Sequence, residues 1–218
     1  MYVKGLIKMV KIDYKKRYNN INEAISDAKE INAFVEELLG VKVKIRFYKK
    51  CATPILRGTY NMRTNSISMF MDNCINLSDD IEANRPALLR VIVHEHMHSM
   101  QKLTDFEKVA YANDEKYHDV VENENELRTL KFIKTNIKVL SHMMQIPPMN
   151  FYLDKLAFII YRDIFIALKG YRGKAYTVPA EMQKAISIIA SDDMLDKISI
   201  SLSTESLFKR KPNGWEMD

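Results

Sequence analysis

The pattern of hydrophobic and polar positions divides the chain into a first part rich in strands and a remainder rich in helices. Four segments of the first part show the alternation or the short apolar runs of strands, at residues 2–13, 41–48, 58–62 and 66–71. The last two flank a short turn and predict a hairpin. Between the first two, apolar residues recur at helical spacing up to Leu39, which predicts a helix with Asn19 or Asn20 as its N-cap and Gly40 at its end.

The remainder of the chain is predicted to be mostly helical. Four segments have helical patterns of apolar residues, at 86–103, 120–143, 150–169 and 179–190. Residues 104–118 lack a clean period and predict a loop or short turns. A small sheet followed by a helical second half is an α+β fold. We expect residues 1–145 to form the core domain and residues 146–218 to form a helical extension packed on it.

Composition narrows the class of protein. Of the 218 residues, 47% are hydrophobic and only six are glycine and six proline, which excludes long low-complexity stretches. Lysines interrupt the apolar N-terminus, so no signal peptide is predicted, and the most apolar helix carries charged residues and does not suit a membrane. Cys51 and Cys74, with no CxxC motif, indicate reduced thiols. These features predict a cytoplasmic protein.

Charge gives little support to a nucleic-acid partner. The net charge is +5, but residues of both signs are mixed along the chain and form no long basic run. A nucleic-acid-associated regulator would rest on this charge and the basic tail alone. We therefore do not expect nucleic acid to be the partner.

His94, Glu95 and His98 supply the order H-E-x-x-H within the predicted helix at 86–103. Residues four apart on a helix lie on one face, so both imidazoles can bind one ion. Glu95 lies about 100° further around the axis, within reach of a water on that ion. Two ring nitrogens and one carboxylate that is not a ligand suit a hydrolytic zinc site. With five histidines in the chain, chance would give this spacing about 0.01 times, so the motif is specific.

Zinc in a catalytic site usually has a third protein ligand, and an acidic segment downstream can supply one. Glu122, Glu124 and Glu126 occupy alternate positions in the segment HDVVENENELRTLKFI. Here the chain resembles the gluzincin metallopeptidases, whose third ligand is a glutamate on the helix after the active-site helix. It resembles in part the ImmA/IrrE-type branch of phages and mobile elements, where that helix carries a pattern like E-x-E-A-x-x-F-A. Leu127 departs from this pattern by replacing the first small residue.

The resemblance implies a ligand set and a fold. Glu124 would be the third zinc ligand, with Glu122 and Glu126 as alternatives; the same three carboxylates would also suit a solvated first turn of a helix. The fold would be zincin-like, a small mixed sheet with an edge strand beside the active-site helix. A peptide would pair with that strand, and we expect it to be residues 66–71.

The implied function is zinc-dependent hydrolysis of a peptide bond in a protein or peptide substrate, which could be one regulatory protein. A zinc-activated water would attack the peptide carbonyl, with Glu95 as the general base. His118 would donate to the oxyanion, as a His or Tyr does in many gluzincins, or act as the third ligand, as in SprT-like proteases, or be a structural loop residue. His96 points away from the other two histidines. We therefore expect it to lie at the surface, or to contact the metal ligands without binding the metal itself.

The alternative is a zincin-fold protein that holds a partner without cleaving it. Glu95 argues against this alternative, because a protein that only binds has no use for a general base.

Overall fold

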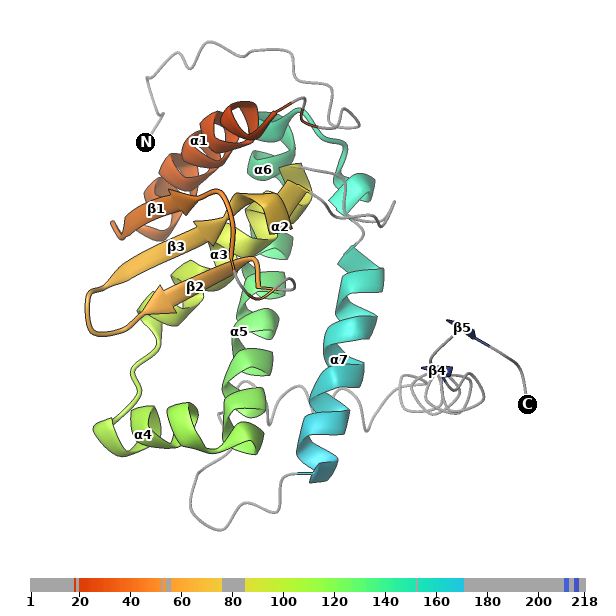
Figure 1. Cartoon of the computed structure of the whole chain (residues 1–218). Coiled ribbons are helices and arrows are strands. Elements are labelled where there is room, and N and C mark those ends of the chain that lie inside the picture. The colour runs from red at the N-terminus through yellow and green to blue at the C-terminus, as the bar shows by residue number, and fades with distance from the viewer. Residues whose placement is uncertain are drawn as a thin grey trace. The chain divides into compact units, whose positions relative to one another are not determined.

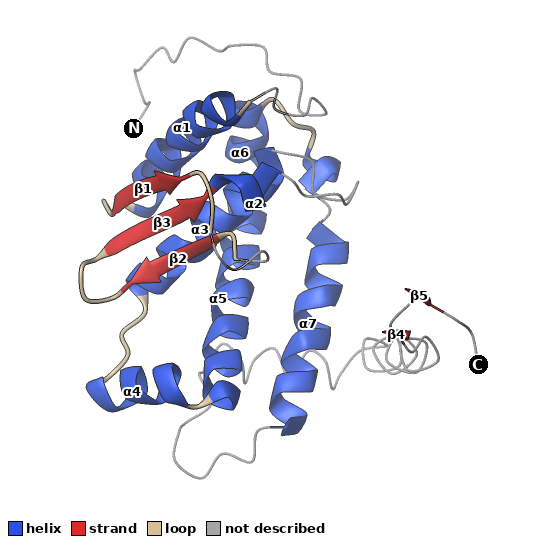
Figure 2. Ribbon diagram, viewed as in Figure 1, coloured by secondary structure: helices blue, strands red, loops and turns tan. Residues whose placement is uncertain are grey.

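The computed structural model describes residues 18, 20–51, 53, 56–75, 85–151, 153–170, 210–211 and 214–215. It is a mixed α+β structure in which a small sheet precedes a mostly helical region (Figures 1 and 2). The chain divides into two compact units. One contains the described residues up to Lys102 together with Arg128–Leu153, and the other contains Leu103–Leu127 and the described residues from Asp154 onwards.

The sheet of the first unit has three strands. They are β1 (Lys44–Tyr48), β2 (Gly58–Asn61) and β3 (Ser66–Phe70), in the order β1-β3-β2. β2 and β3 form the predicted hairpin, and β1 runs parallel to β3. The side chain of Asn61 accepts hydrogen bonds from the backbone N–H groups of Arg63 and Thr64, and Asn65 takes a left-handed conformation at φ 46°. These features close the hairpin turn.

The prediction that residues 66–71 form the edge strand is wrong. β3 pairs on both sides, and β2 is the last strand on one side of the described sheet (Figure 1). The residues of β3 are mostly buried, as expected for a central strand, whereas β2 is partly exposed. A hairpin pattern shows that two strands pair, but it does not show which of them also accepts a strand from elsewhere in the chain.

The helix before the sheet is confirmed with both of its predicted ends. α1 (Ile21–Leu39) starts at Asn20, whose side chain accepts from two backbone N–H groups, and ends at Gly40, which is left-handed at φ 67°. It packs against the motif helix α3 (Arg85–Met100), which also packs against β2. The core of the first unit lies between these elements and is formed by buried apolar residues that include Ala28, Ile31, Val35, Ile67, Met69, Leu88 and Ile92.

A buried ion pair fixes the start of α3. Nε of Arg85 lies 2.6 and 2.8 Å from the two carboxylate oxygens of Asp27 on α1, and its Nη1 donates to the backbone carbonyl of Met144 at 3.2 Å. Tyr18 donates its hydroxyl to the same carboxylate, and burial together with this negative charge raises the pKa of Tyr18. The charge of Asp27 is therefore matched by a guanidinium in a place where an unpaired charge would be costly.

The remaining helices differ from the sequence prediction in two places. They are α2 (Met71–Ile75), α4 (Asp105–Asn113), α5 (Glu115–Thr135), α6 (Ile137–Met144), the 3-10 helix η1 (Pro148–Phe151) and α7 (Leu153–Gly170). The predicted loop at 104–118 is wrong, because Thr104 and Glu107 form a capping box that starts α4. The single helix predicted at 120–143 is two helices, since Asn136 separates α5 from α6.

The second unit has its own small cluster of buried residues. Ala110 of α4 packs with Tyr117 and Val121 of α5, and Leu103 and Tyr111 lie against this cluster. Further along the chain are two short paired strands, β4 (Arg210–Lys211) and β5 (Gly214–Trp215). α5 runs unbroken from this unit into the first one.

Two predicted elements, the strand at 2–13 and the helix at 179–190, lie outside the described residues. None of the helices that the structure describes combines the length and the apolar character needed to cross a membrane.

Candidate metal centre

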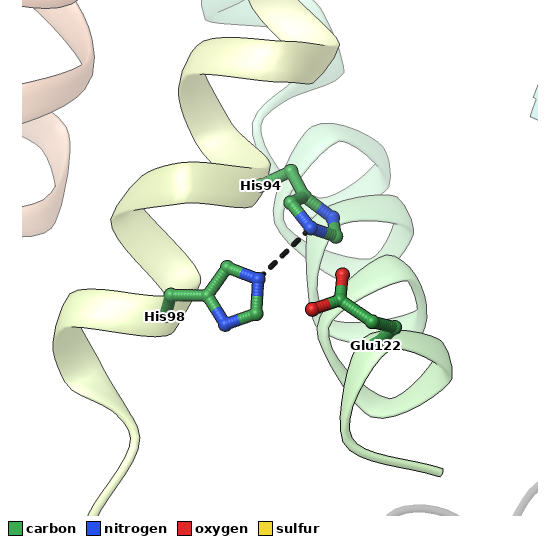
Figure 3. Close-up of side chains that lie close together, drawn as sticks. All are labelled: His94, His98 and Glu122. Carbon is green, nitrogen blue, oxygen red and sulfur yellow. Dashed lines mark hydrogen bonds between the residues drawn. The ribbon is translucent and has the colours of Figure 1, made fainter. Parts of the chain in front are cut away.

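The two motif histidines lie side by side on α3. This helix is buried along most of its length, with Leu88, Leu89 and Ile92 in the core, so its orientation is fixed by packing on several sides. His94 and His98 are one turn apart, and their Nε2 atoms are 3.1 Å from each other (Figure 3). At this distance one nitrogen donates a proton to the other, or both lone pairs point towards a shared cation.

The other ring nitrogen of His98 has a partner that favours metal binding through Nε2. Nδ1 lies 3.3 Å from Oε1 of Gln101, an oxygen that can only accept a hydrogen bond. A proton on Nδ1 leaves the lone pair on Nε2. Hydrogen bonds of this kind select the tautomer and orientation of histidine ligands in metal sites.

Glu122 on α5 supplies a third donor. One ligand atom from each of His94, His98 and Glu122 lies within 4.8 Å of the other two, and in Figure 3 the carboxylate points towards the imidazoles. Two atoms about 2.1 Å from a tetrahedral zinc ion are about 3.4 Å apart, so the two imidazole nitrogens already have nearly this spacing. Two nitrogens and one carboxylate oxygen are donors that zinc accepts, and these residues could hold a metal ion.

The structure places Glu124 on a different face of α5 from Glu122, whereas Glu126 lies one turn further along the same side. Glu124, which the family resemblance favours as a ligand, is buried and does not belong to the group with the two histidines; neither does Glu126, which is half-buried. Residues two apart on a helix differ by about 200°, so Glu122 and Glu124 project in nearly opposite directions. The rotation of α5 about its own axis therefore decides which carboxylate can approach the histidines. The alternation of glutamates in the sequence does not reveal this rotation.

Glu95 is buried beside the first residue of β2. A Cβ atom on Gly58 would lie only 2.7 Å from Oε1 of Glu95 and 3.0 Å from its Cγ. Glu95 itself is 5% exposed. The carboxylate that the motif marks as a general base thus occupies the space that a side chain on β2 would take. The sequence gives no sign of this contact, because Gly58 also suits the start of a strand.

His118 lies on α5 and not in a loop, and it is half-exposed. Its Nε2 is 3.8 Å from Oε1 of Glu122, and its ring stacks on that of Tyr111, with centroids 4.8 Å apart and planes 9° apart. Tyr111 donates a hydrogen bond from its hydroxyl to Glu122. Sequence reasoning missed Tyr111, because residues 104–118 showed no helical period; the Thr104–Glu107 spacing was the available signal of a helix start.

His96 is a buried core histidine. It is fully buried, and its Nε2 lies 2.9 Å from Oδ1 of Asn32 on α1. Burial lowers the pKa of His96, so the neutral ring is favoured. The expected surface position is wrong, because α1 covers this side of α3.

No protein-family model, curated protein or solved structure matches this chain. What the structure itself offers is a possible metal-binding group, with His94 and His98 on α3 and Glu122 on α5, the second helix after it.

Proposed function

We propose that the protein is a zinc metallopeptidase. His94, His98 and Glu122 hold the zinc, and Glu95 is the general base. The proposal rests on two imidazole nitrogens and a carboxylate oxygen that lie within 4.8 Å of one another. The buried carboxylate of Glu95 directly follows His94 on α3. This arrangement provides ligands and a base as separate residues, as hydrolysis requires.

Each residue has one role. Zinc, when bound, acts as a Lewis acid on a peptide carbonyl and lowers the pKa of a water molecule. Glu95 accepts the proton of the attacking water and later gives it to the leaving amine, because a carboxylate can do both in turn. Glu95 is not a member of the ligand group, so the role proposed for it is proton transfer and not metal binding.

The proposed substrate is an extended peptide that pairs with β2. β2 is the last strand on its side of the described sheet, and its first residue lies directly against Glu95. Edge strands bind extended peptides through backbone hydrogen bonds. A peptide paired with β2 would bring its carbonyl groups towards Glu95. The peptide-binding edge strand is thus residues 58–61 and not residues 66–71.

The decisive experiment compares wild type with Glu95→Gln. The amide keeps the size of the side chain and removes the base, so zinc content should be retained while hydrolysis falls by about 10²–10⁴-fold. Ser99→Ala is a matched control on the same helix, because the Ser99 hydroxyl donates to the backbone carbonyl of His96 at 2.7 Å and Ser99 does not belong to the ligand group. Cleavage of casein and of a peptide library is measured at equal metal content.

A narrow natural substrate calls for a second assay. New protein N-termini are identified by mass spectrometry in a cell lysate treated with wild type, Glu95→Gln or Ser99→Ala. Termini that depend on Glu95 support the peptidase. If wild type and Glu95→Gln give identical termini and neither cleaves casein, the peptidase proposal is rejected. The protein would then be a zincin-like protein that binds its partner without cutting it.

The ligand set is tested by metal content and affinity. His94→Ala and His98→Ala should each abolish stoichiometric zinc, measured by mass spectrometry of the purified protein. Glu122→Gln should weaken zinc binding far more than Glu124→Gln or Glu126→Gln, since an amide replaces an anionic ligand poorly. A larger effect at Glu124 would restore the assignment that the family resemblance implies.

A further inference from the structure

Tyr111 is connected to the candidate metal centre through its hydroxyl group. Its hydroxyl donates a hydrogen bond to Oε1 of Glu122, eleven positions further along the chain. The bond joins a neutral donor to a carboxylate, which is stronger than a bond between two neutral groups. A carboxylate has about four lone-pair positions, so accepting this bond is compatible with binding a cation.

The tyrosine ring is itself held in place. It stacks on His118 with an interplanar angle of 9°, and it packs against the cluster of Ala110, Tyr117 and Val121. The helix that carries it is fixed at its start by the capping box of Thr104 and Glu107. Because the ring is held by the stack and the cluster, its hydroxyl is a fixed donor and not a mobile one.

We propose that Tyr111 is a positioning residue that orients Glu122 for metal binding; this inference rests on the proposed function. A glutamate side chain has three rotatable bonds, and holding one rotamer before the ion arrives removes an entropic cost from binding. Hydrogen bonds to metal-binding carboxylates act in this way, and their loss typically weakens metal affinity by about 10–100-fold. Tyr111 would act through Glu122 and would not contact the ion.

The test uses Tyr111→Phe, which keeps the ring and its stack on His118 and removes only the hydroxyl. Zinc affinity is measured by competition with a chromogenic chelator, and the stability of the metal-free protein by thermal unfolding. We expect zinc affinity to fall by about 10–100-fold while the unfolding temperature of the metal-free protein stays close to that of wild type. Tyr117→Phe is the matched control, because the Tyr117 hydroxyl bonds to Glu107 in the same unit. It should leave zinc affinity unchanged.

A double-mutant cycle separates orientation of Glu122 from a general structural effect. In a Glu122→Ala background, Tyr111→Phe should cause no further loss of zinc affinity, because the group that it orients is gone. The inference is overturned if Tyr111→Phe binds zinc as tightly as wild type, or if its effect persists without Glu122. Either result leaves the proposed function standing provided that wild type binds zinc through His94 and His98. A wild-type protein that binds no zinc would instead overturn the proposed function and this inference together.

Discussion

At the level of single residues, Gly58 at the start of β2 lies directly against Glu95 of the motif helix. Gly58→Ala would place a methyl group 2.7 Å from Oε1 of Glu95 and 3.0 Å from Cγ1 of Val91. Relieving this overlap should destabilise the protein by about 1–3 kcal/mol and displace the carboxylate, so hydrolysis should fall. Zinc content should be unchanged, because both histidines lie on the helix itself. Thermal unfolding, metal analysis and cleavage assays measure the three effects.

The control for this prediction is the same substitution in a protein that lacks the Glu95 side chain. In a Glu95→Ala background, the cost of Gly58→Ala should shrink, because two of the three nearest atoms belong to the Glu95 side chain and have been removed. An equal cost in both backgrounds would show that the strain arises elsewhere.

The two cysteines should differ sharply in reactivity. Burial raises the pKa of Cys74 to about 12, and the residue is 2% exposed, whereas Cys51 is partly exposed. The thiolate is the reactive form, so Cys74 should be inert at neutral pH in the folded protein. We expect a thiol-specific dye to modify one cysteine rapidly and the second only after unfolding. Cys51→Ser should lose the rapid phase; a rapid phase that survives in this variant would contradict the assignment.

At this scale the sequence predicted the parts of the site that depend on local geometry. His94 and His98 lie on one helix at a spacing of four, so their approach follows from helical periodicity alone. The third donor depends on the rotation of another helix about its axis, and the alternating glutamates leave that rotation open. The role of Tyr111 depends on a contact between two helices that follow each other in the chain, and that of Gly58 on the docking of the hairpin on α3; neither residue type indicates such a contact.

At the level of elements, the ion pair between Asp27 and Arg85 holds α1, the start of α3 and the end of α6 together. Asp27→Asn leaves a buried guanidinium without its anion, so unfolding free energy should fall by about 3–5 kcal/mol in chemical denaturation. Glu30→Gln is the matched control on the same helix: its carboxylate is 3.4 Å from Arg85, but its side chain is 55% exposed. It should cost about 1 kcal/mol or less. Equal effects would show that burial of the pair matters little.

Elements with strong local signals were predicted and those set by distant pairing were not. α1 has a capping asparagine, a clear apolar face and a glycine at its end, and all three were confirmed. The central place of β3 depends on its pairing with β1, which precedes β2 in the sequence, so no pattern within the hairpin could reveal it. α4 had a local signal in Thr104 and Glu107, but its weak apolar periodicity hid the helix.

For the whole molecule, bound zinc should increase the free energy of unfolding. A ligand that binds only the folded state stabilises it by about 2.7 kcal/mol at 100 times its dissociation constant. Adding zinc to chelator-treated wild type should therefore raise the unfolding temperature in calorimetry. His94→Ala and His98→Ala should lose this response, and Ser99→Ala should keep it. A full response in the histidine variants would place the zinc elsewhere on the chain.

The fold class was predicted from the order of strand and helix patterns, and the mixed α+β structure agrees with it. The division into a core at 1–145 and an extension at 146–218 stays a prediction. The boundary between two compact units depends on which helices contact each other. Amphipathic patterns in a sequence do not specify which partner covers each apolar face.

The placement of both histidines on one helix has a consequence for a newly made chain. They become neighbours as soon as two turns of α3 exist, because their contact is local. Glu95 lies 37 positions after Gly58 (95 − 58 = 37), and their contact requires the hairpin to dock on the helix. Under the proposed function, the two histidines would be ready for zinc before the hairpin fixes the position of Glu95, and the third proposed ligand, Glu122, would follow only when α5 forms. A complete metal site and a placed base would then both arise from contacts between elements and not from α3 alone.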